Sequence, residues 1–333
     1  MVGIMDDASL RADTGQFNQG YQHLRTRSQD GRPGITLGLM TPLGSELGRG
    51  EMVPADRSIT VAQQAEAAGF RGLWVRDVPL AIPQGLSPEN QQAVFLDDPF
   101  LMLGAMAQAT STITIGTAAT VLPLRHPLHV AKSALTLDRL SGGRFVLGIG
   151  SGDRLEEFEI FAKNLDDRRD DIQQGWSLLR AALSPEGTDR DSLLSATGGY
   201  APTTPPPARI PLIAVGSARQ TVQWIVRNAD GWATYYRPAK QQVGRLDLWN
   251  QARATVKDPS NDSPLLISSM GLDLVSRGAP TTVELGLRTT SQDLITHLHT
   301  MRDLGIDHVI LNIGGRSAGE IIAQIGAEVI PYL

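Results

Sequence analysis

Short apolar runs alternate with amphipathic stretches along the chain from Gly34 to the C-terminus. Each run is followed by a loop and then by a segment whose apolar residues recur every three or four positions. In one such segment, Ile172, Trp176 and Leu179 fall on one face of a helix. The pattern therefore predicts eight strands, each followed by a helix, with the strands at residues 35–40, 72–77, 112–117, 144–149, 211–215, 231–234, 265–271 and 307–312.

Repeated strand–helix units predict an α/β fold with a parallel sheet. Eight units within residues 34–333 predict a single closed (β/α)₈ barrel, the TIM barrel, and the alternative is an open Rossmann-type sheet with a small second domain. The loops favour the barrel, because the connections at 41–57 and 78–97 are long whereas the link at 141–143 is short. We expect these insertions in the βα loops, at the end where such barrels bind ligands.

Two segments depart from this rhythm. The link before strand five, residues 184–209, contains Pro202, Pro205, Pro206 and Pro207, and we expect it to be an extended segment on the surface. Residues 1–33 lack an apolar core and therefore do not resemble a signal peptide. We expect them to form a flexible N-terminal arm in front of the barrel.

Composition narrows the classes of function. The net charge of −5 and the absence of a basic block argue against nucleic acid as a partner. The absence of cysteine excludes disulfides and thiolate metal sites. No apolar run approaches the roughly 18 residues of a membrane span, and the six histidines include no H-x-x-x-H pair. We therefore expect a cytoplasmic protein without a metal site.

Candidate binding residues occur where predicted strands end. The third strand runs into Thr117, Ala118 and Ala119, whose small side chains would let a flat ligand lie against the backbone. The alternative is that these residues relieve crowding inside a narrow barrel. The fourth strand ends in Ser151 and Gly152 within a glycine-rich stretch that lacks the full G-x-G-x-x-G pattern. This stretch is either a strand end beside a ligand or a plain turn.

Two loops are equal candidates for a phosphate site. Gly216 and Ser217 follow strand five, where a helix N-terminus would offer free N–H groups. The loop at 314–317 follows strand eight, where many barrels hold phosphate. Either loop could instead be an ordinary helix cap. Asp77 closes strand two and should point toward the same rim, or else tie a loop or cap a helix.

The sequence also resembles the bacterial luciferase-like monooxygenase family. Residues 116–127 and 137–145 are similar to the family's G-T-A-x-x-x-L-P-x-x-H-P and L-D-x-x-S-x-G-R-F stretches at the same separation. Residues 229–232 and 328–331 are similar to the family as well. The resemblance covers nearly all of residues 35–333, and the family includes alkanesulfonate and alkane monooxygenases and deazaflavin-dependent reductases.

The resemblance implies a TIM barrel that binds reduced FMN, or in some branches a deazaflavin, at the carboxyl ends of its strands. It places the ring against a non-prolyl cis peptide at Ala118–Ala119 and the phosphate near strands four and five. The implied cofactor-binding residues are Thr117, Ala118, Ala119, Ser151, Gly152, Arg169, Gly216 and Ser217.

The leading hypothesis is a two-component FMN monooxygenase that oxidises a small organic substrate with O₂ and is supplied by a separate flavin reductase. The alternatives are a deazaflavin-dependent reductase, a non-catalytic flavin-binding protein and a phosphosugar isomerase on the same barrel. Asp77, Arg125 and His126 are the candidates for proton transfer. Val78 stands where luciferases place a catalytic His, and Ser151 where some members carry a phosphate-binding Arg. The family also implies a homodimer.

Overall fold

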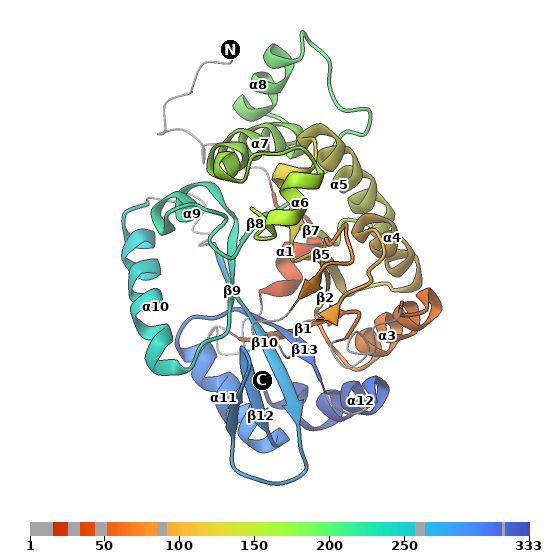
Figure 1. Cartoon of the computed structure of the whole chain (residues 1–333), viewed down its shortest axis with the longest axis vertical. Coiled ribbons are helices and arrows are strands. Elements are labelled where there is room, and N and C mark those ends of the chain that lie inside the picture. The colour runs from red at the N-terminus through yellow and green to blue at the C-terminus, as the bar shows by residue number, and fades with distance from the viewer. Residues whose placement is uncertain (1–15, 26–33, 44–51, 85–91, 257–263, 315–316) are drawn as a thin grey trace.

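Eight parallel strands close into a barrel surrounded by helices (Figure 1). The computed structural model describes residues 16–25, 34–43, 52–84, 92–256, 264–314 and 317–333. The barrel closes because β10 pairs with both β9 and β13, and β13 pairs with β1. The TIM barrel is confirmed, and each predicted strand matches one of these to within a few residues. The barrel strands are β1 (Thr36–Thr41), β2 (Gly72–Val75), β5 (Thr114–Thr117), β7 (Phe145–Gly150), β8 (Leu212–Val215), β9 (Gly231–Tyr235), β10 (Leu265–Leu274) and β13 (His308–Ile313).

The helices outside the barrel bury the apolar stripes that the sequence predicts. In α7, for example, Ile172, Trp176 and Leu179 are all buried against the strands. Helix α5 begins with a proline in its first turn and ends at Gly142, which has the left-handed backbone (φ 66°) of a helix stop. The outer helices are α3 (Ala55–Ala67), α4 (Pro99–Ala109), α5 (Pro127–Ser141), α7 (Arg168–Leu183), α9 (Val222–Asn228), α10 (Ala239–Ala254), α11 (Ser291–Asp303) and α12 (Ala318–Glu328). Among the described residues, no helix is both long and apolar enough to cross a bilayer.

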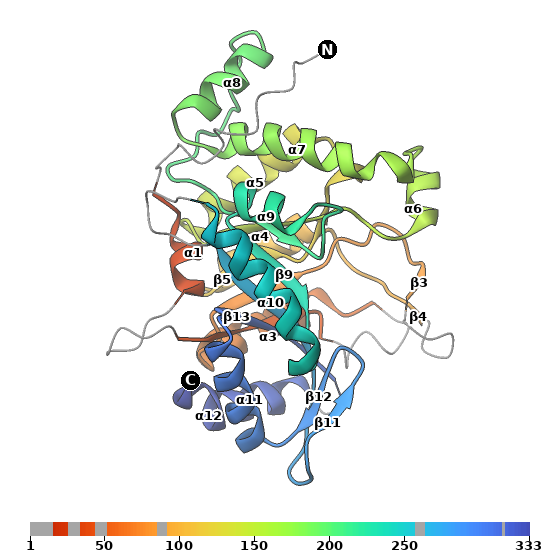
Figure 2. The same ribbon diagram turned by 90° about the vertical axis from the view of Figure 1, so that its left-hand side faces the viewer.

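Small extra elements gather at the carboxyl ends of the barrel strands. Figure 2 shows the β3–β4 hairpin and α6 on the side of the molecule opposite to α1. These insertions build the rim that carries the candidate site. The extra elements are β3 (Pro83–Gln84), β4 (Gln92–Ala93), β6 (Thr120–Val121), α6 (Leu155–Ile160), β11 (Thr281–Val283), β12 (Gly286–Thr289) and the 3₁₀ turns Leu122–Leu124 and Leu165–Asp167. A further 3₁₀ turn, Ile330–Tyr332, follows α12 at the amino end of the barrel, near Gly69.

The proline-containing link before strand five is only partly extended. Its first half forms α8 (Thr188–Ala196), which stands away from the barrel (Figure 1). Gly198 and Gly199 follow with left-handed backbones (φ 69° and 95°) that let the chain turn after the helix. The expectation of an extended segment therefore fails for α8 and describes only the stretch that holds the prolines.

A short N-terminal helix, α1 (Gln19–Leu24), covers the amino end of the barrel. Tyr21 and Leu24 are buried, and the Asn18 amide donates to Asp138 Oδ1 and to the Phe145 carbonyl, both at 2.7 Å. Residues 16–25 are therefore packed, and the expected flexible arm is wrong for this stretch. The helical spacing of Phe17, Tyr21 and Leu24 is the signal that the sequence offered. The rest of the expected arm lies outside the described residues.

The barrel interior is filled from the amino end by an aromatic pair. Trp74, which is fully buried, donates from Nε1 to His308 Nε2 at 3.0 Å. A Cβ on Gly38 would lie 2.6 Å from His308 Nε2, and a Cβ on Gly72 would lie 2.7 Å from Trp74 Nε1. Both glycines are therefore needed for the Trp74–His308 pair to fit inside the barrel.

Candidate functional site

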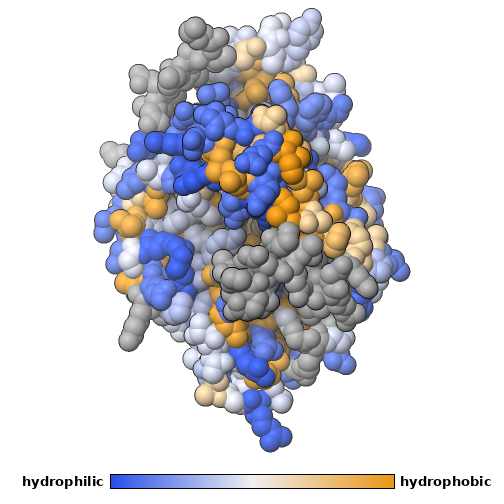
Figure 3. Space-filling model, viewed as in Figure 1, coloured by the Kyte–Doolittle hydropathy of each residue, from blue (hydrophilic) through white to orange (hydrophobic). Residues whose placement is uncertain are grey.

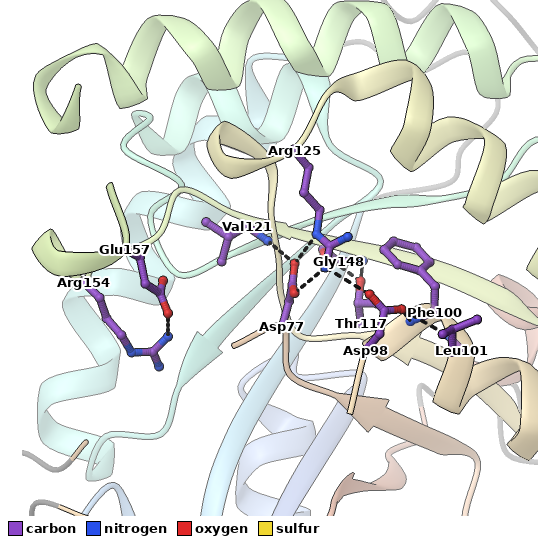
Figure 4. Close-up of polar contacts among 10 residues, drawn as sticks. All are labelled: Asp77, Asp98, Phe100, Leu101, Thr117, Val121, Arg125, Gly148, Arg154 and Glu157. Atoms are coloured by element: carbon purple, nitrogen blue, oxygen red, sulfur yellow. Dashed lines mark hydrogen bonds and ion pairs between the residues drawn. The ribbon is translucent and has the colours of Figure 1, made fainter. Parts of the chain in front are cut away.

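Asp77 and Arg125 form a two-point ion pair at the carboxyl rim (Figure 4). Asp77 follows β2 and is almost completely buried, with 5% of its surface exposed. Arg125 donates from Nε to Asp77 Oδ2 at 2.8 Å and from Nη2 to Asp77 Oδ1 at 2.7 Å. The Val121 amide donates a third hydrogen bond to Asp77. The structure thus brings two of the three proposed catalytic residues together, and each uses its hydrogen-bonding atoms to bind the other.

The surroundings of Arg125 hold it in the charged state. Burial alone would lower the pKa of Arg125, but Asp77 and then Asp98 raise it above the ordinary value. Asp98 also caps α4 by accepting hydrogen bonds from the Phe100 and Leu101 amides, and the guanidinium carbon of Arg125 lies 5.6 Å from the centre of the Phe100 ring. The Asp77–Arg125 pair therefore connects the end of β2 to α4 and to the segment before α5.

His126, the third proposed catalytic residue, caps a helix. Its Nδ1 accepts a hydrogen bond from the Leu128 amide at 3.2 Å, and its ring is exposed at the start of α5. The ring contacts His129 edge-on, with centroids 5.9 Å apart. Since the capping bond needs an unprotonated Nδ1, proton donation from this atom would break the cap.

The end of β5 presents a small, flat surface. The resemblance places a cis peptide at Ala118–Ala119, and the structure has one there. Both alanines are half-buried, and a Cβ on Gly150 of β7 would lie only 3.0 Å from the Ala119 Cβ. Thr117 is fully buried, and its hydroxyl both donates to the Gly148 carbonyl and accepts from the Gly148 amide. Thr117 therefore joins β5 to β7. Its hydroxyl proton is already used in the bond to Gly148, so it is not available to donate to a cofactor.

Arg168, rather than the predicted Arg169, contacts the loop after β7. Arg168 donates to the Gly152 carbonyl at 3.0 Å and to the Leu165 carbonyl at 2.6 Å, and it is buried. The Arg169 side chain is exposed, and only its backbone carbonyl is engaged, by Gln220. In the same loop Ser151 is half-buried, and its hydroxyl makes only a long, 3.5 Å contact with the Gly152 carbonyl.

The turn after β8 lies near Arg168. Burial lowers the pKa of Arg168 and the nearby Arg219 lowers it further, whereas Asp166 and Asp153 raise it, so the Arg168 and Arg219 guanidinium groups lie near each other. Gly216, with a left-handed φ of 66°, uses its amide to bond the Ala233 carbonyl. Ser217 is exposed, and its hydroxyl accepts from the Arg219 amide.

The expected helix N-terminus is not at this turn. Helix α9 begins only at Val222, with Thr221 as its cap, because Ala218 and Arg219 also have left-handed backbones (φ 45° and 56°) that no α-helix accommodates. The rival phosphate loop at 314–317 includes residues 315 and 316, which lie outside the described residues.

Sequence reasoning missed three further charged residues at this rim. Glu157 in α6 is fully buried and pairs with Arg154 at 3.0 Å, and burial raises the pKa of its carboxyl against the lowering effect of Arg154. Arg76, one residue beyond β2, has two buried guanidinium nitrogens without a hydrogen-bond partner. The i,i+3 spacing of Arg154 and Glu157 was a signal for their pairing, whereas nothing in the sequence marked Arg76, which lies at the end of a different strand. Groups of three metal-ligating side chains are absent from the described part of the chain.

The rim combines features that suit a flat, anionic ligand. The half-buried Ala118 and Ala119 offer contact without steric bulk, and Arg168 and Arg219 lie beside the ends of β7 and β8. The Ser151 hydroxyl is available in the same loop. A planar ring with a phosphate-bearing tail fits this arrangement, because phosphate binding favours guanidinium groups.

Comparisons with known proteins identify relatives of this chain. An uncharacterised protein of Mycobacterium tuberculosis is 28% identical over 288 residues, covering 81% of this chain and 93% of that protein. The F420-dependent hydroxymycolic acid dehydrogenase of the same organism is 30% identical over 224 residues, covering 63% of this chain and 57% of that enzyme.

The fold is shared with solved structures as well. An F420-dependent secondary alcohol dehydrogenase in complex with an F420–acetone adduct superposes with a TM-score of 0.67 at 18% identity, covering 89% of this chain and 98% of that one. The family model described as luciferase-like monooxygenase matches residues 35–270. Because this match spans most of the barrel and includes the rim residues from Asp77 to Ser217, the chain belongs to the luciferase-like monooxygenase family.

Proposed function

We propose that this protein is an oxidoreductase that binds a flavin-type cofactor at the carboxyl rim of the barrel. The observation that carries the proposal is the proximity of Arg168 to the glycine-rich end of β7, next to the small-residue end of β5. Family membership supports the same assignment, because the family model describes monooxygenases. The cofactor supplies the electrons when it is bound, so the chain must hold the ring, exclude water and admit a substrate.

Different rim residues would contact the ring and the phosphate-bearing tail of the cofactor. Ala118 and Ala119 give the ring a flat support, and Gly150 leaves space beside Ala119. Arg168 and Arg219 would hold the phosphate, and the Ser151 hydroxyl in the loop after β7 would donate a hydrogen bond to it. Arg168 replaces Arg169 in this assignment, because only Arg168 contacts the loop.

The first candidate activity is that of a two-component FMN monooxygenase. In this role the chain takes reduced FMN from a separate reductase and oxidises a small organic substrate with O₂. The Asp77–Arg125 pair positions the loops around the ring. Val78 is buried beside it, so the rim lacks an imidazole at this point. An apolar wall here helps to exclude water from the reacting atoms.

The second candidate is a deazaflavin-dependent hydride transfer, supported by the F420-dependent relative at 30% identity. The two cofactors carry a similar ring and a phosphate on the tail, so the same rim residues would serve either. Oxygen distinguishes the two activities, because only the monooxygenase consumes O₂ with its substrate.

Separate titrations with FMN and with F420, in oxidised and reduced form, test the proposal. We expect one cofactor to bind with a micromolar or lower dissociation constant. Quenching of fluorescence on binding measures this constant. Arg168→Met should weaken this binding about 10- to 100-fold, as loss of a charge-assisted hydrogen bond predicts. The matched control Arg169→Met, one position along the same helix, should change it less than about twofold.

Two outcomes would contradict the proposal. If neither cofactor binds, or if Arg169→Met weakens binding as much as Arg168→Met, the assignment of the rim fails. If a cofactor binds but no tested alcohol, aldehyde or carboxylic acid is turned over with or without O₂, the chain is a flavin carrier rather than an enzyme.

A further inference from the structure

Arg76 lies at the mouth of the barrel. It comes two residues after Trp74, whose ring fills the interior, and side chains alternate in direction along a strand. Arg76 therefore points to the inside of the barrel, whereas Asp77 points outward to Arg125. Tyr235, at the end of β9 on the far side of the barrel, is close enough to affect the pKa of Arg76.

The guanidinium of Arg76 has no acidic partner in the described part of the chain. Its Nε and Nη2 are buried and make no hydrogen bond. Its charged neighbour Arg154 repels it, and together with burial this lowers the pKa of Arg76, while Tyr235 acts in the opposite direction. A buried charge is normally paired, because removing an ion from water costs several kcal/mol that a counter-ion must offset.

The two buried acidic groups nearby are engaged elsewhere, and Asp153 in the same region is exposed to solvent. Asp77 is held by Arg125, and Glu157 pairs with Arg154. Arg154 is paired in this way, whereas Nε and Nη2 of Arg76 have no hydrogen-bond partner among the described residues. Arginine remains protonated even when burial lowers its pKa, so the charge persists at neutral pH.

The unpaired edge of Arg76 has the shape that binds a carboxylate. Nε and Nη2 lie side by side on one edge of the guanidinium and can donate two parallel hydrogen bonds. The same molecule shows this arrangement 49 residues along the chain, where Arg125 uses its Nε and Nη2 to hold both oxygens of Asp77. In addition, Asn312 at the end of β13 has a buried side-chain oxygen without a hydrogen-bond donor.

An apolar area lies on the same face of the molecule. Leu155, Ile160 and Phe161 in and after α6 are exposed, and hydrophobic atoms gather over this region (Figure 3). Exposed apolar patches of this kind mark binding surfaces for apolar groups. A ligand with an alkyl chain and a terminal anion would suit both features.

We propose that Arg76 binds the carboxylate of a small aliphatic substrate, with the Nε and Nη2 edge taking its two oxygens. The inference rests on the proposed function, because it places the substrate at the rim where the cofactor ring lies. The phosphate of the cofactor is a less suitable partner. Arg168 already stands at the loop after β7, whereas Arg76 follows β2, which pairs with β5 on the side away from β7.

Calorimetric titration of the cofactor-loaded protein with matched acids and alcohols tests this proposal. The probes are butanoate, hexanoate and octanoate, each compared with the alcohol of equal chain length. We expect at least one acid to bind the unmodified protein about tenfold or more tightly than its alcohol. Arg76→Met should remove this difference, and Arg76→Lys should restore part of it, since Lys keeps the charge but loses the two-point geometry.

Arg139→Met, which removes an exposed arginine at the end of α5, is the matched control and should keep the preference for the acid. The proposal is overturned if no acid binds better than its alcohol, or if Arg76→Met keeps the preference. It is also overturned if Arg76→Met weakens cofactor binding more than tenfold and leaves the preference for the acid, because Arg76 would then serve the cofactor.

Failure of the proposed function gives a different result. In that case neither FMN nor F420 binds the unmodified protein, and the same titrations are made on the cofactor-free protein. A preference for acids that Arg76→Met removes would then still assign the carboxylate site to Arg76. Circular dichroism of each variant checks that the barrel is folded.

Discussion

His308 gives the barrel a pH-dependent stability that can be measured. Its ring is completely buried, Nε2 accepts from Trp74, and Nδ1 lies 2.7 Å from the Thr36 hydroxyl, which donates to the Leu24 carbonyl. These partners require a neutral ring that carries its proton on Nδ1. Burial lowers the pKa of His308 from 6.5 to about 3.

The sign of the effect follows from where the proton binds. Above about pH 6.5 the histidine is neutral in both the folded and the unfolded chain, so it does not affect stability. Below this pH the unfolded chain takes up a proton that the folded chain refuses until about pH 3. The free energy of unfolding therefore falls as the pH falls through this window, by about 2 kcal/mol between pH 7 and pH 5.

Urea unfolding at pH 7, 6 and 5, followed by tryptophan fluorescence, measures this effect. The test variant is His308→Gln, whose amide oxygen can accept from Trp74 but does not titrate. We expect it to be less stable at pH 7 and to lose about 2 kcal/mol less than the unmodified protein on going to pH 5. The control His129→Gln removes an exposed histidine and should leave the pH dependence unchanged. Equal pH dependence in His308→Gln and the unmodified protein would refute the reasoning.

The same urea assay checks two predictions about packing and charge. Gly38→Ala should lower the free energy of unfolding by about 1–3 kcal/mol, because its Cβ would meet backbone and ring atoms at under 3 Å. Gly244→Ala, where the Cβ meets nothing in an exposed helix, should raise it by up to about 1 kcal/mol. Arg125→Met should lower it by about 2–3 kcal/mol, since Asp77 stays buried without its ion pair. Arg302→Met, at an exposed pair, should change it by less than about 1 kcal/mol. Reversal of either contrast would refute the corresponding argument.

Periodicity predicted the barrel because each strand and helix must bury one face, and that requirement is local. All eight strands were found this way, since their apolar runs are bounded by loops and followed by helical spacing. The same reasoning failed for α8, because residues 188–196 are mostly polar and, among the side chains that the structure describes there, Leu193 is the one that joins the core. It also failed for α1, where the helical spacing of three apolar residues was present but too short to stand out.

Strand ends were a useful guide to the rim but not to the contacts made there. The sequence placed Asp77 and Arg125 on the same rim, yet only the fold shows that they hold each other. Arg168 and Arg169 are equivalent in sequence, and the choice between them depends on which side of a helix faces the loop after β7. Such a choice turns on a rotation of 100° per residue, finer than the uncertainty in a predicted helix boundary.

Arg76 shows most clearly what a sequence cannot reveal. Next to Asp77, an arginine would be expected to form a local ion pair. Adjacent residues of a strand point to opposite sides, however, so Asp77 goes outward to Arg125 and Arg76 goes inward. Two neighbouring opposite charges are thereby separated by the wall of the barrel. One is satisfied by a residue 48 positions away, and the other faces the mouth, where Nε and Nη2 find no hydrogen-bond partner among the residues that the structure describes.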